Sequence, residues 1–305
     1  VQRINYFENL LTSSLTNTDY QEGNEMIKQN FNCNWLFSIG GNSLADPGRN
    51  QVVSVTVPHD AEIVRPRDPQ APGASSNGFF RSENCCYEKE FMLNTADSGK
   101  IVCLEFEGVY HNSYIYINGA YAARHPYGYS RFFVDATKFV RFGTQNKVRV
   151  VVKNGVASGR WYTGGGIYRD VHIMIADRLH YRPEGIRLTT VELENDLAVV
   201  RVDSVVANTG IGTRGVRLKM ELLDKDGNIV AQNEIPVTIF EHSENSYRQT
   251  LYVPVPHLWS DETPYLYRYR ASILENDMVV DTETGTFGIR KLSLDPMNGL
   301  CVNGN

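Results

Sequence analysis

The chain has 305 residues, with 30 lysines and arginines against 35 aspartates and glutamates and a formal net charge of −5. At this length we expect two domains with separate hydrophobic cores. Because the basic residues are scattered, the sequence has no basic patch for a phosphate backbone, and no apolar run approaches the roughly 18 residues of a membrane-spanning helix. We therefore expect no nucleic-acid partner and no membrane insertion.

Residues 1–25 are polar with weak periodicity, and we interpret them as a leader. The chain begins at Val1 without a basic and then apolar stretch, which indicates that a signal peptide was removed or never present. The seven histidines show no metal-ligand spacing, and the cysteines show neither a zinc pattern nor a disulfide framework. The cysteines are Cys33, Cys85, Cys86, Cys103 and Cys301. We expect no metal site.

Period-two alternation of apolar and polar residues predicts β-strands along almost the whole chain. In residues 216–222, for example, Val216, Leu218 and Met220 share one face. Asn118-Gly119 and Asp226-Gly227 predict tight hairpin turns. In chain order, the expected strands are residues 52–57, 87–93, 101–106, 113–117, 120–123, 148–153, 167–175, 186–193, 198–206, 216–222, 247–253, 267–274 and 278–287.

Many short strands joined by Gly, Asn, Asp and Pro turns indicate an all-β chain of two β-sandwiches. We place their boundary near residues 178–185, where an apolar strand gives way to a polar stretch containing Pro183 and Gly185. The first sandwich then spans residues 26–180 and the second, of immunoglobulin-like size, residues 181–290. Residues 300–305 begin a hairpin for which the sequence shows no partner.

Residues 159–171 (GRWYTGGGIYRDV) place aromatic and charged side chains on a glycine-rich turn before a strand. A sugar needs a flat face to stack on and donors for its hydroxyls, which Trp161, Tyr162 and Arg160 would supply. In the alternative interpretation, Trp161 fills the core and Arg160 pairs with a carboxylate. A phosphate cradle is disfavoured because a strand, not a helix, follows the turn.

Two further groups of residues have competing interpretations. Residues 125–132 (HPYGYSRF) would line a binding rim or form a strand connection with Tyr129 and Phe132 in the core. Glu105 and Glu107 lie two apart on one strand face, and we interpret them as a solvated surface rather than as an acid/base pair. The sequence contains no Gly-x-Ser-x-Gly motif for a nucleophilic serine.

Short motifs follow one another in a recognisable order: residues 32–37 (NCNWLF), 57–60 (VPHD), 106–109 (FEGV), 117–119 (ING), 125–132 (HPYGYSRF), 160–169 (RWYTGGGIYR), 258–267 (LWSDETPYLY), 287–290 (FGIR) and 300–304 (LCVNG). Together they resemble the N-terminal part of glycoside hydrolase family 2 enzymes, most of all the bacterial β-galactosidases. Residues 81–87 (RSENCCY) depart from the Gly-x-x-Trp-Tyr-Arg of many relatives. This departure weakens the choice among galactosidase, glucuronidase and mannosidase.

The resemblance implies a jelly-roll, galactose-binding-like β-sandwich, then an immunoglobulin-like β-sandwich, and at residues 291–305 the start of a (β/α)₈ catalytic barrel that is missing from this chain. It implies a retaining exo-glycosidase without an organic cofactor, whose two catalytic glutamates lie on the barrel, so that no catalytic residue lies in this chain. Carried over to this sequence, Arg160 would donate to sugar hydroxyls and Tyr162 would contact the rim. Trp161 would be a packing anchor beside them.

The function that we expect is therefore a non-catalytic fragment of an enzyme that hydrolyses terminal β-galactosides in carbohydrate metabolism. The partners implied are a β-galactoside or related oligosaccharide and the missing barrel, and a homo-oligomer is left open. A periplasmic or secreted location fits this function better than a cytoplasmic one. The alternatives are a stand-alone carbohydrate-binding or adhesion module, or a β-glucuronidase or β-mannosidase of the same family.

Overall fold

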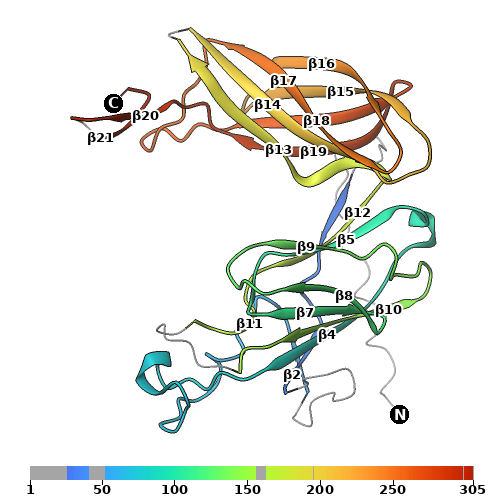
Figure 1. Ribbon diagram of the computed structural model, residues 1–305. Coiled ribbons are helices and arrows are strands. Elements are labelled where there is room, and N and C mark those ends of the chain that lie inside the picture. Colours follow the sequence, from blue (N-terminus) through green and yellow to red (C-terminus); the bar gives the residue numbers. More distant parts are fainter. Residues whose placement is uncertain (1–25, 41–51, 156–162, 195, 298, 305) are drawn as a thin grey trace, which may run out of the picture.

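The computed structural model describes residues 26–40, 52–155, 163–194, 196–297 and 299–304. In these ranges the chain forms two β-sandwiches, which lie one above the other in Figure 1, and a separate hairpin near the C-terminal end. The helical turns found there are two 3-10 helices, η1 (Ala74–Asn77) and η2 (Thr95–Asp97). The prediction of an all-β chain is confirmed. None of the helical segments described is long and apolar enough to cross a membrane.

The first sandwich packs a four-stranded sheet, in the order β1-β12-β5-β9, against a six-stranded sheet, in the order β3-β2-β4-β10-β7-β8. A two-stranded pair, β6 and β11, lies beside them. The core between the sheets includes Trp35, Phe106 and Ile115, all fully buried. The strands are β1 (Ile27–Asn30), β2 (Trp35–Ile39), β3 (Val53–Val55), β4 (Cys85–Met92), β5 (Ile101–Phe106), β6 (Val109–Tyr110), β7 (Ser113–Ile117), β8 (Ala120–His125), β9 (Phe132–Asp135), β10 (Gln145–Val152), β11 (Gly166–Ile167) and β12 (Val171–Ala176).

The single strand expected over residues 167–175 is wrong, because the chain changes sheets within it. β11 pairs with β6, whereas β12 pairs with β1 and β5. Asn32 fixes the point of change: its Oδ1 accepts from Val171 N at 2.8 Å, and its Nδ2 donates to Asp170 Oδ1 at 2.8 Å. Residues 168–170 therefore lie between the two strands and belong to neither ladder.

The second sandwich has seven strands in two sheets, in the orders β13-β14-β17 and β16-β15-β18-β19. This is the strand number of a constant-type immunoglobulin domain. Asp226-Gly227 lies in the predicted turn between β15 and β16, where the Asp224 carboxylate accepts from the backbone of Asp226 and Asn228. The strands are β13 (Leu179–Leu193), β14 (Leu197–Asn208), β15 (Arg214–Leu223), β16 (Ile229–Ile239), β17 (Ser243–Pro254), β18 (Tyr267–Glu275) and β19 (Met278–Phe287).

The boundary between the sandwiches is a strand and not the polar break that the sequence predicts. β13 runs through residues 179–185, and its Leu179 and Tyr181 are buried in the second core. Pro183 and Gly185 lie at a register shift between Tyr181 and Ile186, where β13 bulges away from β14. The polar residues thus belong to a bulge, which interrupts the pairing without ending the strand.

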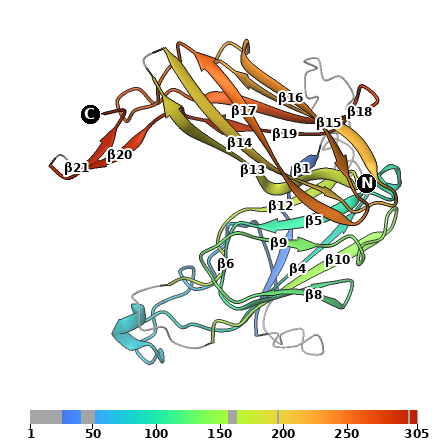
Figure 2. The same cartoon turned by 45° about the horizontal axis from the view of Figure 1, so that its top comes forward.

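The C-terminal hairpin consists of β20 (Leu292–Asp295) and β21 (Gly299–Val302). Residues 300–302 therefore have a partner within the chain, and the expectation that they lack one is wrong. In both views the hairpin projects from the second sandwich on the same side of the molecule as the η1 segment of the first sandwich (Figures 1 and 2).

The buried carboxyl group of Asp281, in β19, joins three segments of the chain. It accepts hydrogen bonds from Met26 N at 3.1 Å and Tyr181 N at 2.7 Å, and burial raises the pKa of Asp281 to about 7. This pKa lies above the unfolded value of about 3.9, so the native state favours the protonated carboxyl group of Asp281. Its contribution to the free energy of unfolding is complete below about pH 4 and is lost as the pH rises through about 7. Asp281→Asn removes this titration. Between about pH 4 and about pH 8, we expect the unfolding free energy of the native protein to fall by up to about 4 kcal/mol relative to that of the variant.

Urea unfolding of both proteins at several pH values in this window measures the effect. Asp261→Asn is the matched control, because Asp261 is exposed in a loop of the second sandwich. Its unfolding curves should follow those of the native protein at every pH. A gap between native protein and Asp281→Asn that stays constant would mean that Asp281 keeps its charge throughout.

Candidate functional site

Two long loops meet at one end of the first sandwich. Residues 56–84, which carry η1, connect β3 to β4, and residues 153–165 connect β10 to β11. His59 N donates to Ile167 O and Ala61 N donates to Gly165 O, each at 2.8 Å. We call the region of residues 59–62, Asn154 and residues 164–166 the loop junction.

A buried amide and a buried carboxyl group hold the loop junction together. Asn154 Nδ2 donates to Glu62 Oε1 at 2.6 Å and to Gly164 O at 3.0 Å. Both side chains belong to residues only 2% exposed. Burial raises the pKa of Glu62, against the opposing effect of contacts with Ser82 and Asn77. Because Glu62 is buried and accepts from Asn154 of the other loop, it joins the two loops to each other.

Tyr87 of β4 packs against the loop junction and contacts His59 in it. Tyr87 is fully buried, and its Oη lies 2.8 Å from His59 Nδ1 and donates to His59 O at 3.3 Å. Burial lowers the pKa of His59 and raises that of Tyr87 well above its ordinary value, so both side chains are uncharged near neutral pH. The backbone of Gly166 passes close to the Tyr87 hydroxyl group with φ +93°, and a Cβ added there would lie 2.1 Å from Tyr87 Oη. Only glycine fits at this position.

The residues that the sequence singles out for sugar contact, Arg160, Trp161 and Tyr162, lie outside the described residues. The structure places what flanks them: Asn154 on one side and residues 163–166 on the other, both held at the loop junction. The roles of the three side chains stay predictions. Glu62 and Asn154 are missed by reasoning from sequence, because neither stands in a distinctive motif and they are 92 positions apart.

Residues 125–132 divide between the two interpretations made from the sequence. Phe132 is buried, and it stacks on His125 with ring centroids 4.2 Å apart. Tyr129 is 44% exposed and Tyr127 61% exposed, so the expectation that Tyr129 lies in the core is wrong. Tyr168 Oη donates to Gly128 O at 2.8 Å, which fixes the connection while both tyrosines point outward.

The interpretation of Glu105 and Glu107 as a solvated pair is wrong for Glu105, whereas Glu107 is partly exposed. Glu105 is only 1% exposed, because Lys28, Arg131 and His172 surround its carboxylate. His172 stands opposite Glu105 in the pairing of β5 with β12. The sequence carried no sign of this contact, since the register between two strands so far apart is not a local property.

The fold is that of a jelly-roll sandwich followed by an immunoglobulin-like sandwich. The model described as the sugar binding domain of glycosyl hydrolases family 2 matches residues 47–177, and the model described as glycosyl hydrolases family 2 matches residues 184–290. The chain belongs to glycosyl hydrolases family 2, as its motifs predict.

Individual relatives agree with this assignment. The β-galactosidase BoGH2A of Bacteroides ovatus is 32% identical over 281 residues, which cover 91% of this chain and 33% of the relative. A β-glucuronidase of Formosa agariphila is 27% identical over 313 residues, 94% of this chain and 32% of the relative. The crystal structure of a family 2 member from Bacteroides cellulosilyticus has a TM-score of 0.85 and 35% identity, covering 91% of this chain and 37% of that one. The chain thus spans about a third of the length of these relatives.

Proposed function

We propose that the chain is the non-catalytic N-terminal part of a retaining exo-glycosidase that hydrolyses terminal β-galactosides. The observation that carries this proposal is the match of two family 2 models in order along the chain, together with the likeness to a β-galactosidase over 91% of it. The two catalytic glutamates would lie on a (β/α)₈ barrel that follows residue 305. Because a β-glucuronidase matches nearly the whole chain as well, a β-glucuronide is the alternative substrate.

Within that enzyme, residues 160–162 would reach the subsite that holds the terminal sugar. Two observations support this role: the loop junction anchors both flanks of the segment, and the η1 loop lies on the same side of the molecule as the β20–β21 hairpin, from which a barrel would continue (Figures 1 and 2). The Arg160 guanidinium would donate to sugar hydroxyls and Tyr162 would contact the rim, with Trp161 packed beneath. A periplasmic or secreted location suits an enzyme that meets its glycosides outside the cytoplasm.

The test compares the 305-residue chain with the protein translated from a gene that continues past residue 305. We expect the longer protein to cleave p-nitrophenyl β-galactoside with a kcat/KM at least tenfold above those for the β-glucuronide and β-mannoside. The 305-residue chain should turn over none of them, and calorimetry should detect no binding of galactosides to it. Preference for the glucuronide would overturn the proposed substrate. Turnover or tight binding by the short chain would overturn the accessory role.

Replacing Arg160 in the longer protein tests the subsite. Loss of charge-assisted hydrogen bonds worth about 1.5–3 kcal/mol predicts that Arg160→Ala lowers kcat/KM about 10- to 150-fold. Arg67→Ala is the matched control, because Arg67 is exposed on the neighbouring loop and lies over the Phe80 ring. It should leave kcat/KM within twofold. An Arg160→Ala enzyme with native kinetics would assign this residue to packing.

A further inference from the structure

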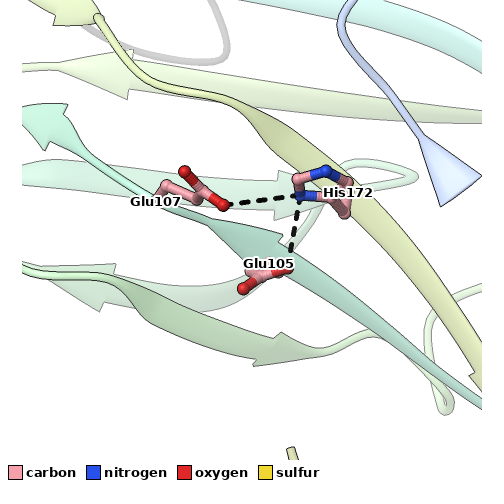
Figure 3. Close-up of side chains that lie close together, drawn as sticks. All are labelled: Glu105, Glu107 and His172. Atoms are coloured by element: carbon pink, nitrogen blue, oxygen red, sulfur yellow. Dashed lines mark ion pairs between the residues drawn. The ribbon is translucent and has the colours of Figure 1, made fainter. Parts of the chain in front are cut away.

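Three metal-ligating side chains converge on the outer face of the four-stranded sheet of the first sandwich. Glu105 and Glu107 come from β5 and the residue just after it, and His172 comes from β12 (Figure 3). His172 Nδ1 lies 3.3 Å from Glu105 Oε2 and 4.0 Å from Glu107 Oε1, and the three ligand atoms lie within 4.8 Å of one another. Tetrahedral coordination with bonds of about 2.1 Å places ligand atoms about 3.4 Å apart. Small side-chain rotations would bring the three atoms to that spacing.

Two of the three ligand atoms, Glu105 Oε2 and His172 Nδ1, are buried. The Glu105 side chain is only 2% exposed and its Oε2 is held by an ion pair, whereas His172 Nδ1 makes no hydrogen bond within the part of the chain that the structure describes. A proton on His172 Nδ1 or a cation between the two atoms, which lie 3.3 Å apart, would satisfy both of them. Lys28 Nζ, 2.6 Å from Glu105 Oε2, supplies a charge at present.

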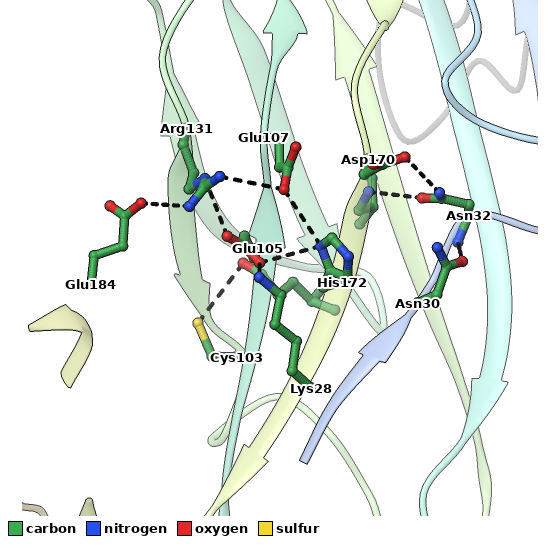
Figure 4. A network of polar contacts seen from close by, with 12 residues as sticks. Lys28, Asn30, Asn32, Cys103, Glu105, Glu107, Arg131, Asp170, His172 and Glu184 are labelled. Carbon is green, nitrogen blue, oxygen red and sulfur yellow. Dashed lines mark hydrogen bonds and ion pairs between the residues drawn. The ribbon is translucent and has the colours of Figure 1, made fainter. Parts of the chain in front are cut away.

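Carboxylates outnumber the fixed cations in the surrounding network (Figure 4). Arg131 contacts Glu105 at 3.2 Å, Glu107 at 3.4 Å and Glu184 of the second sandwich at 2.5 Å. Lys28 and Arg131 are thus two cations that form ion pairs with the three carboxylates of Glu105, Glu107 and Glu184. The cluster therefore carries a negative charge beyond what its own lysine and arginine balance.

From this geometry we propose that Glu105, Glu107 and His172 bind one divalent transition-metal ion, which displaces the ammonium group of Lys28. Two carboxylates and one imidazole are a ligand set that suits Zn²⁺, Co²⁺ or Mn²⁺, with the remaining positions filled by water. Lys28 can withdraw because its side chain is 43% exposed, whereas Glu105 is fixed in place by burial. Through Arg131 and Glu184 the metal ion would be linked to the second sandwich as well.

Titration of the 305-residue chain with Co²⁺ tests the proposal. We expect visible absorption bands of coordinated Co²⁺ that saturate at one equivalent and disappear on addition of Zn²⁺. Glu107→Gln and His172→Gln should each weaken binding at least tenfold. The matched controls are Glu90→Gln, an exposed carboxylate on β4, and His257→Gln, an exposed imidazole of the second sandwich. Both controls should bind Co²⁺ like the native chain.

Lys28→Met separates a metal site from an ion-pair network. Removal of the competing ammonium should tighten Co²⁺ binding about five- to tenfold, since one nearby positive charge opposes the incoming ion. Because Lys28 is partly exposed, this variant should fold, so it remains informative if another variant is unstable. Absence of the absorption bands in the native chain, or bands that Glu107→Gln, His172→Gln and Lys28→Met leave unchanged, would overturn the proposal.

Discussion

Gly166→Ala should lower the free energy of unfolding of the first sandwich by about 3 kcal/mol or more. Gly166 has φ +93°, a conformation that L-residues adopt only at a cost of about 1–2 kcal/mol. The added Cβ would lie 2.1 Å from Tyr87 Oη and 3.2 Å from the backbone oxygen of His59. Because Tyr87 is fully buried and held by His59, its ring cannot withdraw. Urea or calorimetric unfolding measures the loss.

A second glycine provides the matched control for this substitution. Gly119 has φ +82° in the β7–β8 turn, but an added Cβ there would meet nothing within 4 Å. Gly119→Ala should therefore lower the free energy of unfolding only by the cost of the positive φ angle, about 1 kcal/mol. Tyr87→Phe combined with Gly166→Ala should recover part of the larger loss, since it removes the clashing oxygen. Equal costs for the two glycine substitutions would contradict the close approach of Gly166 to Tyr87.

Trp35→Ala should destabilise the first sandwich by about 3–5 kcal/mol, the range typical of removing a large buried aromatic ring. Trp35 is fully buried in β2, its Nε1 donates to Phe31 O at 2.9 Å, and its ring meets that of Phe31 edge to face at 5.8 Å. The substitution leaves a cavity at the centre of the core and removes the hydrogen bond. Differential scanning calorimetry should show a lower unfolding temperature for the transition of the first sandwich.

Two other substitutions calibrate this result. Trp35→Phe keeps an aromatic ring in the same place and should cost roughly half as much as Trp35→Ala. Trp259→Ala removes a partly exposed tryptophan of the second sandwich, whose ring lies 4.7 Å from the Arg290 guanidinium. It should lower the unfolding temperature of the second sandwich, and by less than Trp35→Ala lowers that of the first. A cost below about 1 kcal/mol for Trp35→Ala would contradict the central packing of its ring.

Reasoning from the sequence succeeds where local pattern decides the structure. The alternation in residues 101–106, 113–117 and 278–287 gives the bounds of β5, β7 and β19 to the residue. It fails where distant partners decide. The change of sheet between β11 and β12 depends on Asn32, and the passage of β13 through the domain boundary depends on the hydrogen bond from Tyr181 to Asp281, 100 positions away.

The same distinction holds for the residues of the candidate sites. A glycine turn that brings the backbone close to a neighbour can be predicted from Gly164, Gly165 and Gly166 alone, and the structure finds all three buried. The partners that surround such a turn cannot be predicted in this way. The contact between Glu62 and Asn154 and that between Glu105 and His172 each join separate strands or loops whose register only the folded chain defines.

The uninterrupted course of β13 determines where the two sandwiches can be exchanged between family members. A chimaera joined inside residues 178–185 would sever the ladder pairs from Leu179 with Asn208 to Tyr181 with Val206. It would also place a foreign backbone next to the Asp281 carboxyl group, which accepts a hydrogen bond from Tyr181 N. A crossover at residues 177–178 leaves β13 intact, so an exchange of the first sandwich between family members should be joined there.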